Sequence, residues 1–271
     1  MSWTTNLHDD PYLKRQVITI YGPPKIGKTS LLVNLLDQTT DHVVYLMSVD
    51  KGNKRISMAA EKYGGRMALD FPTRLKEFRK SINEVAQRAG AVAAKRGAGK
   101  VWVVVDTVTH MQMFLMAEAR TFDVKESNKP SGKAPSQPPG EDEIYVRDMT
   151  TRADYNINLT HMVELSNQIL KIPCNIVFMA LEKQFKSEKT GNEVTMVALS
   201  GQSKDKILGD SDIIARMVEG GGGSRVFITA PGNGVEAGDR NGKLGTSEPA
   251  DLLKMYNKIY GTGTAEQSTT G

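Results

Sequence analysis

The chain has 271 residues, of which 39% are apolar, so it can bury a sizeable core, and its length favours one large domain. A single cysteine, Cys174, excludes an intramolecular disulfide. No apolar run approaches the roughly 20 residues that span a bilayer, and the first residues lack the charged-then-apolar pattern of a signal peptide. We therefore expect a cytoplasmic protein.

The charge is unevenly distributed, although the net charge is only +4. Residues 51–100 hold thirteen Lys or Arg and four Asp or Glu, an excess of nine positive charges, so the rest of the chain is net acidic. A basic region of this size can attract a polyanion such as nucleic acid, although an exposed basic helix face is commonly just solvated. Charge alone leaves both interpretations open.

Five apolar runs rich in β-branched residues predict strands at 17–21, 43–49, 101–105, 175–181 and 225–229. Most are apolar throughout, as expected for strands covered on both faces. Apolar residues at three- and four-residue spacing predict helices over 30–36, 75–92 and 159–170. This alternation predicts an α/β fold with a mainly parallel sheet flanked by helices.

Two stretches break the pattern. Residues 125–143 are rich in Pro, Ser, Gly and charge, which predicts a mobile loop inside the domain. The second is the tail from Gly261 onward, which is expected to be disordered. The methionine-rich stretch 110–116, by contrast, lies within the pattern and is interpreted as core packing. We divide the chain into an N-terminal segment at 1–15, one domain at 16–260 with a loop insertion at 121–145, and a disordered tail at 261–271.

Residues 22–29, Gly-Pro-Pro-Lys-Ile-Gly-Lys-Thr, fit the phosphate-loop pattern G-x-x-x-x-G-K-[ST] between a predicted strand and a predicted helix. The glycines let main-chain N–H groups converge on phosphate oxygens, and the helix N-terminus adds partial positive charge. We expect Lys28 to reach the β- and γ-phosphates and Thr29 to ligate Mg²⁺. The predicted residues that bind a nucleoside triphosphate are Gly22, Pro23, Pro24, Lys25, Ile26, Gly27, Lys28, Thr29 and Ser30.

Two acidic residues follow predicted strands and can complete a hydrolytic site. In VWVVVDT, Asp106 comes directly after five apolar residues, and its carboxylate would hold a water on the magnesium ion. In VVYLMSVDKGN, Asp50 closes the strand after the first helix, where its carboxylate would orient or deprotonate water. Both positions also suit a turn-forming aspartate. Asp106 occurs together with the phosphate loop, which favours the metal-binding role for this residue. For Asp50, a turn-forming aspartate remains the alternative.

With these residues in order, the chain resembles RecA-type ATPases over roughly residues 16–245, and within them the small phage RecA-core proteins grouped with a phage AAA-domain nucleotide-binding family. The resemblance implies a RecA-like fold, ATP and Mg²⁺ as ligands, and a homo-oligomer, either a filament or a ring. It also implies the host-cell cytoplasm as the location. The catalytic carboxylate maps onto Asp50, where most recombinases have glutamate.

Later segments carry further resemblance. The stretch DYNINLTHMVELSNQILKIPCNIVFMALEKQ is similar to the helix and strand that lead to the family's polar sensor residue, a position that Leu181 occupies here. The stretch VEAGDRNGKL resembles a segment whose basic residue reaches the nucleotide of a neighbouring subunit, which implies a catalytic Arg240 acting in trans, with Lys243 on the same turn. The alternative is an ordinary turn with solvated charges.

In RecA-like filaments, two loops that face the axis bind DNA, and they correspond to roughly residues 121–145 and 183–206. Phe122 and Phe185 are the candidate aromatic residues in these loops for base stacking. The alternative is that both loops are merely exposed. The DNA-binding residues predicted for the second loop are Lys183, Lys186, Lys189, Lys204 and Lys206.

These features predict a DNA-stimulated ATPase that binds single-stranded DNA in phage recombination, strand annealing or replication, in some settings beside a single-stranded-DNA-binding protein. One alternative is a regulatory or motor ATPase of the same fold that acts on protein partners. Another is a small-molecule kinase, which the insertion at 125–143 disfavours because it carries no arginine for a lid.

Overall fold

The structure is a computed structural model that describes residues 14–49, 54–123, 144–146, 150–188, 191–232 and 234–261. Three of the sequence predictions fall outside these residues, namely the catalytic role of Asp50, the DNA contact of Lys189, and the disordered tail after Gly261. Most of the predicted loop insertion at 121–145 lies outside them as well. In the part of the chain that is described, no helix is long and apolar enough to cross a membrane.

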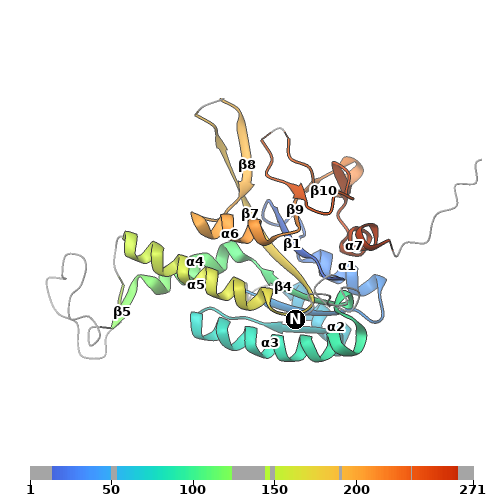
Figure 1. Ribbon diagram of the computed structural model, residues 1–271, viewed down its shortest axis with the longest axis horizontal. Helices are drawn as coiled ribbons and strands as arrows, with labels where there is room; N and C mark the ends of the chain where they lie inside the picture. The colour runs from blue at the N-terminus through green and yellow to red at the C-terminus, as the bar shows by residue number, and fades with distance from the viewer. Residues whose placement is uncertain are drawn as a thin grey trace, which may run out of the picture.

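A ten-stranded sheet forms the centre of the molecule, in the order β12-β10-β9-β1-β7-β4-β2-β3, with β8 paired to β7 and β11 paired to β9 (Figure 1). The six strands from β9 to β3 in this order run parallel, and β10, β12, β8 and β11 are antiparallel to their partners. The parallel strands are β1 (Val17–Gly22), β2 (Val43–Ser48), β3 (Met67–Asp70), β4 (Val101–Asp106), β7 (Asn175–Lys186) and β9 (Ile213–Glu219). The antiparallel strands are β8 (Glu193–Val197), β10 (Arg225–Ile228), β11 (Gly238–Asp239) and β12 (Ser247–Pro249). A separate two-stranded sheet pairs β5 (Thr121–Asp123) with β6 (Ile144–Val146).

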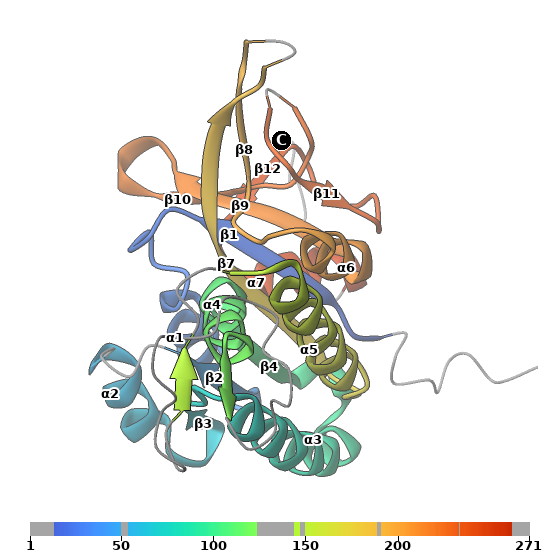
Figure 2. The same ribbon diagram turned by 90° about the vertical axis from the view of Figure 1, so that its left-hand side faces the viewer.

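Seven α-helices in the described residues cover both faces of the sheet. On one face, α3 (Leu75–Arg96), α4 (Val108–Ala119), α5 (Arg152–Leu170) and α6 (Gln202–Asp210) contribute to one hydrophobic core. On the other face, α1 (Ser30–Gln38), α2 (Lys54–Tyr63) and α7 (Leu252–Tyr260) contribute to a second core. Figure 2 shows α1 and α2 on the opposite side of the sheet from α3 and α5. The predicted mainly parallel sheet flanked by helices is therefore confirmed.

The five predicted strands all form, but two differences matter for function. Strand β7 does not end at Leu181 as predicted; it continues to Lys186, because β8 pairs with its second half. Strand β9, which the sequence did not predict, lies directly beside β1. Its sequence, IIARMVE, carries Arg216 in the middle and Glu219 at the end, a weaker signal than the continuous apolar runs of β1 or β4.

The methionine-rich stretch is only partly core, contrary to prediction. Met111 and Leu115 are fully buried on α4, whereas Met113 and Phe114 are exposed. Helical geometry explains the difference, because residues at 111 and 115 share the face that packs on the sheet.

The parallel arrangement brings several strand ends to one edge of the sheet. Gly22 at the end of β1 is level with Leu181, and Ser48 at the end of β2 is level with Asp106 at the end of β4. Carboxyl ends of parallel strands are where such sheets bind ligands. The candidate site lies at this edge.

Candidate nucleotide-binding site

The loop between β1 and α1 is folded as an anion cradle. Lys25 and Gly27 both adopt positive φ, of 65° and 97°, which turns the main chain sharply before the helix. Within the described chain, the main-chain N–H groups of residues 26–29 have no hydrogen-bond acceptor. Free N–H groups at a helix N-terminus bind phosphate oxygens. The predicted residues Gly22 to Ser30 therefore come together as one loop.

Lys28 is the buried cation of this loop. Its ammonium donates hydrogen bonds to the carbonyl oxygens of Gly22 and Pro23, at 3.0 and 2.9 Å, and it forms no ion pair with the described residues. Burial lowers the pKa of Lys28, against the opposing charges of Asp106 and Glu182. A buried ammonium without a contacting carboxylate is costly unless an anion reaches it. The loop thus fits a phosphate chemically as well as by shape.

Thr29 and Asp106 meet across the loop, as the predicted metal site requires. The Thr29 hydroxyl donates a hydrogen bond to Oδ2 of Asp106 at 2.7 Å. No group of three His, Cys, Asp or Glu in the described part of the chain can hold a metal ion. Magnesium prefers oxygen ligands and retains several waters. These two residues therefore suit Mg²⁺ that takes its other ligands from phosphate and water.

The predicted water-activating residue, Asp50, lies just beyond the described end of β2. Its neighbour Val49 donates its main-chain N–H to the carbonyl oxygen of Asp106 at 2.9 Å. The chain therefore leaves β2 beside Asp106. The catalytic role of Asp50 stays a prediction.

A buried ion pair, which the sequence did not predict, flanks the end of β1. Nε of Arg216 on β9 lies 2.9 Å from Oε2 of Glu182 on β7, and both side chains are largely buried. Between them in the sheet is Tyr21, whose hydroxyl donates to the carbonyl oxygen of Glu236. Burial raises the pKa of Tyr21 strongly, so the phenol stays protonated as a donor. These contacts fix the strand that carries the phosphate loop.

The second half of β7 and β8 form a hairpin, residues 182–197, which we call the arm. The first six residues of β7 are buried, whereas the arm projects from the sheet (Figures 1 and 2). Lys183, Phe185 and Lys186 are exposed on it. The ammonium of Lys183 donates to the carbonyl oxygen of Leu199 at 3.2 Å.

Two more of the predicted DNA-binding lysines, Lys204 and Lys206, are engaged in ion pairs within the described chain. Nζ of Lys204 lies 3.0 Å from Oε1 of Glu236, and Nζ of Lys206 lies 2.5 Å from Oδ2 of Asp210. Their charges are offset by these carboxylates, so they offer less to a polyanion than Lys183 and Lys186 do.

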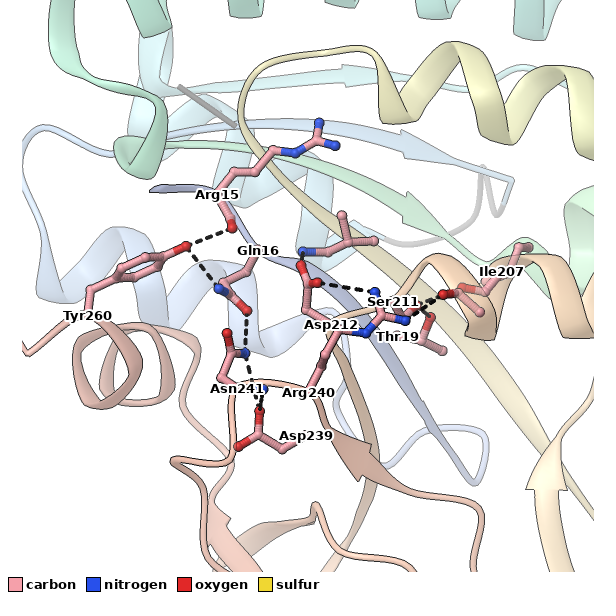
Figure 3. Close-up of polar contacts among 12 residues, drawn as sticks. Arg15, Gln16, Thr19, Ile207, Ser211, Asp212, Asp239, Arg240, Asn241 and Tyr260 are labelled. Carbon is pink, nitrogen blue, oxygen red and sulfur yellow. Dashed lines mark hydrogen bonds and ion pairs between the residues drawn. The ribbon is translucent and has the colours of Figure 1, made fainter. Parts of the chain in front are cut away.

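Arg240 does not lie near its own phosphate loop. Its Nη2 donates to the carbonyl oxygen of Gly209 at 2.7 Å, and its Nη1 lies 3.7 Å from Oδ1 of Asp212 (Figure 3). Asp212 in turn accepts the N–H of Val17 at the start of β1. The loop follows the other end of this six-residue strand, about 16 Å away. Any catalytic role of Arg240 would therefore require a neighbouring subunit.

The strand order and the phosphate loop define a P-loop nucleotide-binding protein with a RecA-like core, in which β7 separates the loop strand β1 from the Asp106 strand β4. Residues 14–241 match the family described as an AAA domain, and the chain belongs to that family, as a P-loop ATPase. Among solved structures, a crystal structure of the RadB recombinase is 18% identical with a TM-score of 0.41, and the match covers 79% of each chain. No curated protein matches the chain.

Proposed function

We propose that this ATPase binds single-stranded DNA through the arm and acts in recombination, strand annealing or replication. One observation carries the proposal: the arm offers exposed cationic and aromatic side chains, and its base is hydrogen-bonded to α4, the helix that begins two residues after Asp106. Resemblance to phage RecA-core proteins is what favours a phage process of this kind.

The chemistry of the arm suits a single strand. Lys183 and Phe185 are two residues apart on β7, so they project from the same face, opposite Met196 and Val194 of β8. A lysine beside an exposed aromatic ring can pair with a phosphate while a base stacks on the ring. Lys186 projects from the opposite face, opposite Glu193. We therefore assign single-stranded DNA to the face of the arm that carries Lys183.

The base of the arm is hydrogen-bonded to α4 on both sides. The Thr109 hydroxyl accepts the N–H of Leu181 at 3.0 Å, where β7 enters the arm. The side-chain amide of Gln112 accepts the N–H of Ser200 and donates to its carbonyl oxygen, at 2.9 and 3.2 Å. Only Thr107 separates Asp106 from α4. A shift of the Asp106 carboxylate would therefore move α4 and, through these hydrogen bonds, both strands at the base of the arm. This arrangement supports DNA stimulation of hydrolysis without a polar side chain at Leu181.

The residues assigned to hydrolysis keep their predicted roles in this proposal. Lys28 would bind the β- and γ-phosphates, Thr29 and Asp106 would hold Mg²⁺, and Asp50 would orient or deprotonate the attacking water. Magnesium, when bound, would neutralise charge that develops on the phosphates. Arg240 would act on the nucleotide of a neighbouring subunit in a homo-oligomer, filament or ring.

Hydrolysis of ATP should be measured with and without a single-stranded oligonucleotide, alongside binding of the same oligonucleotide by fluorescence anisotropy. We expect binding and a stimulated rate, with a smaller effect of duplex DNA. Hydrolysis that proceeds without any binding or stimulation would refute the DNA proposal and leave the ATPase assignment standing.

A second candidate, an ATPase that acts on protein partners, is favoured by one observation. The neighbouring helices α4 and α5 carry several large exposed apolar side chains, namely Met113, Phe114, Tyr155 and Ile157. The same anisotropy experiment separates the two, because a protein-directed ATPase would leave the oligonucleotide unbound.

A further inference from the structure

We infer that Arg225, on β10, is a phosphate-binding residue that acts on the nucleotide of its own subunit. The inference rests on the proposed function to the extent that the phosphate loop binds a nucleotide. It goes beyond that function by adding a cation that neither the loop motif nor the family match assigns.

The position of the Arg225 guanidinium carries the inference. A Cβ atom placed on Gly27 would lie 2.4 Å from Nη1 and 2.6 Å from Cζ of Arg225. The guanidinium therefore rests directly on the phosphate loop, at the glycine before Lys28. A side chain at Gly27 would displace it, which gives this glycine a second role besides its positive φ.

The sheet aims the side chain at the loop. Arg225 is two residues before Phe227 on β10, so both project from the same face of the sheet. Phe227 is fully buried in the core that contains Leu31 and Leu32 of α1. Arg225 therefore projects over the beginning of α1, where phosphates bind. Figure 2 shows β10 beside β9 and β1 at this end of the molecule.

The charge of Arg225 is not used by another described residue. Glu219 lies directly opposite on β9, yet no ion pair forms between them, and Arg225 makes no side-chain hydrogen bond within the described residues. The residue is exposed. An arginine that could pair across the strands but instead rests on an anion-binding loop is placed for the anion.

The location also indicates which phosphates Arg225 contacts. Main-chain N–H groups of a phosphate loop cradle the α- and β-phosphates, whereas the loop lysine reaches the β- and γ-phosphates. Arg225 lies on the main chain at Gly27, so it belongs to the α/β side. Its planar guanidinium can hold two phosphate oxygens at once, which a lysine cannot do.

The test measures dissociation constants of ADP and of ATPγS for the full chain by calorimetry, in Arg225→Ala, Arg225→Lys and Arg225→Gln. Loss of a charge-assisted contact should weaken the binding of ADP and of ATPγS equally, by about 10- to 100-fold in the alanine variant and less in the lysine variant. Arg88→Ala is the matched control, because Arg88 is an exposed arginine on α3, on the other face of the sheet. This variant should bind both nucleotides with unchanged affinity.

Three outcomes would overturn the inference. Unchanged ADP affinity in Arg225→Ala would exclude a contact with the α- and β-phosphates. A loss of affinity confined to ATPγS would place Arg225 at the γ-phosphate instead. Recovery of binding after addition of Lys28→Ala subunits, which carry an intact Arg225, would mean action in trans.

Two further results distinguish a phosphate contact from a failed phosphate-loop assignment and from a structural role of Arg225. Wild-type protein that binds neither nucleotide would refute the phosphate-loop assignment itself. A merely structural Arg225 would lower the melting temperature without nucleotide in all three variants, whereas a phosphate contact lowers only the increase that ADP produces. Should the alanine variant fail to fold, the glutamine variant keeps the first three side-chain carbons and a polar end without the positive charge, and it gives the same comparison.

Discussion

The hydroxyl of Thr29 and the carboxylate of Asp106 are hydrogen-bonded at 2.7 Å, which joins the phosphate loop to the end of β4. Thr29 directly follows Lys28, and the charge of Asp106 acts on the Lys28 ammonium, so the pair lies close to the phosphate-binding cation. A magnesium ion held there would need both, the first as a direct ligand and the second through a water.

Asp106→Asn should raise the Mg²⁺ concentration needed for half-maximal ATP hydrolysis by roughly 10- to 100-fold, because outer carboxylates that hold metal-bound water contribute about that much to metal affinity. Thr29→Val, which keeps the volume and removes the oxygen, should act in the same direction. A magnesium titration of the rate checks both. Thr160→Val on the surface of α5 is the control, and an identical titration curve for all variants would contradict the metal assignment.

Binding of ATP should take up protons at alkaline pH. Burial lowers the pKa of Lys28 in the free protein, and phosphates favour the ammonium and so raise it in the complex. Between the two pKa values the free side chain is partly neutral and the bound one charged, so affinity falls as pH rises through the lower value. Calorimetry in two buffers of different ionisation enthalpy, at about pH 9.5 and about pH 7, measures the uptake. Lys28→Met should abolish turnover and the uptake, and the same uptake in that variant would assign it to another group.

Single-stranded DNA binding should depend on Lys183 and Phe185 more than on Lys206. Reversal to Lys183→Glu should weaken binding and reduce the slope of log affinity against log salt by about 0.7, the value for one phosphate contact on a single strand. Phe185→Ala should weaken binding by about 1–3 kcal/mol and leave the slope unchanged. Anisotropy over a salt series measures both. Lys206→Glu is the matched control because Asp210 already offsets its charge, and equal losses in all variants would argue against the arm.

Gln112→Met should uncouple DNA from hydrolysis. It keeps the side-chain length and removes both hydrogen bonds to Ser200, so the base of the arm loses its tie to α4. We expect the rate without DNA to be retained and the stimulation by DNA to fall. Stability should decrease by about 1–3 kcal/mol, the cost of leaving buried polar groups unpaired. The same substitution at Gln168 on α5 is the control, and full stimulation in Gln112→Met would exclude this route.

Arg240 should distinguish itself from Arg225 in a mixing experiment. If it serves a neighbouring subunit, Arg240→Ala binds ATP normally and hydrolyses it poorly, and added Lys28→Ala subunits restore part of the rate. Arginines supplied in this way contribute roughly 10³- to 10⁵-fold in well-studied cases. Its contacts to Asp212 and Gly209 are exposed, so their loss should cost at most about 1 kcal/mol of stability. No restoration, with assembly intact by sedimentation, would leave Arg240 a structural residue of its turn.

Local signals in the sequence sufficed for the phosphate loop and for Asp106, because each is specified by its own strand and by residues next to it. Continuous apolar runs likewise predicted β1, β2 and β4. The extension of β7 into the arm was missed because Gln184 and Lys186 are polar, and only pairing with β8 makes them strand residues.

Contacts between distant segments could not be predicted in the same way. Arg225 meets Gly27 only because an unpredicted strand, β9, inserts between β10 and β1. The ion pair of Glu182 and Arg216 depends on the same strand. The apolar run of β9 is interrupted by Arg216 and ends at Glu219, so it is shorter than the continuous runs of β1 or β4 and gives a weaker strand signal.

Helix α7 begins beyond residue 241, where the family match ends, yet it is built into the support of the phosphate loop. Leu252, Met255 and Ile259 are buried in the same core as α1, and Asp251 accepts a hydrogen bond from Gln38 at the end of α1. The helix whose N-terminus faces the phosphates is thus braced along its length by a segment far from them. Substitutions in α7 would therefore weaken nucleotide binding although every residue of the loop stayed the same. The functional ATPase domain thus extends further along the chain than the segment that matches the family.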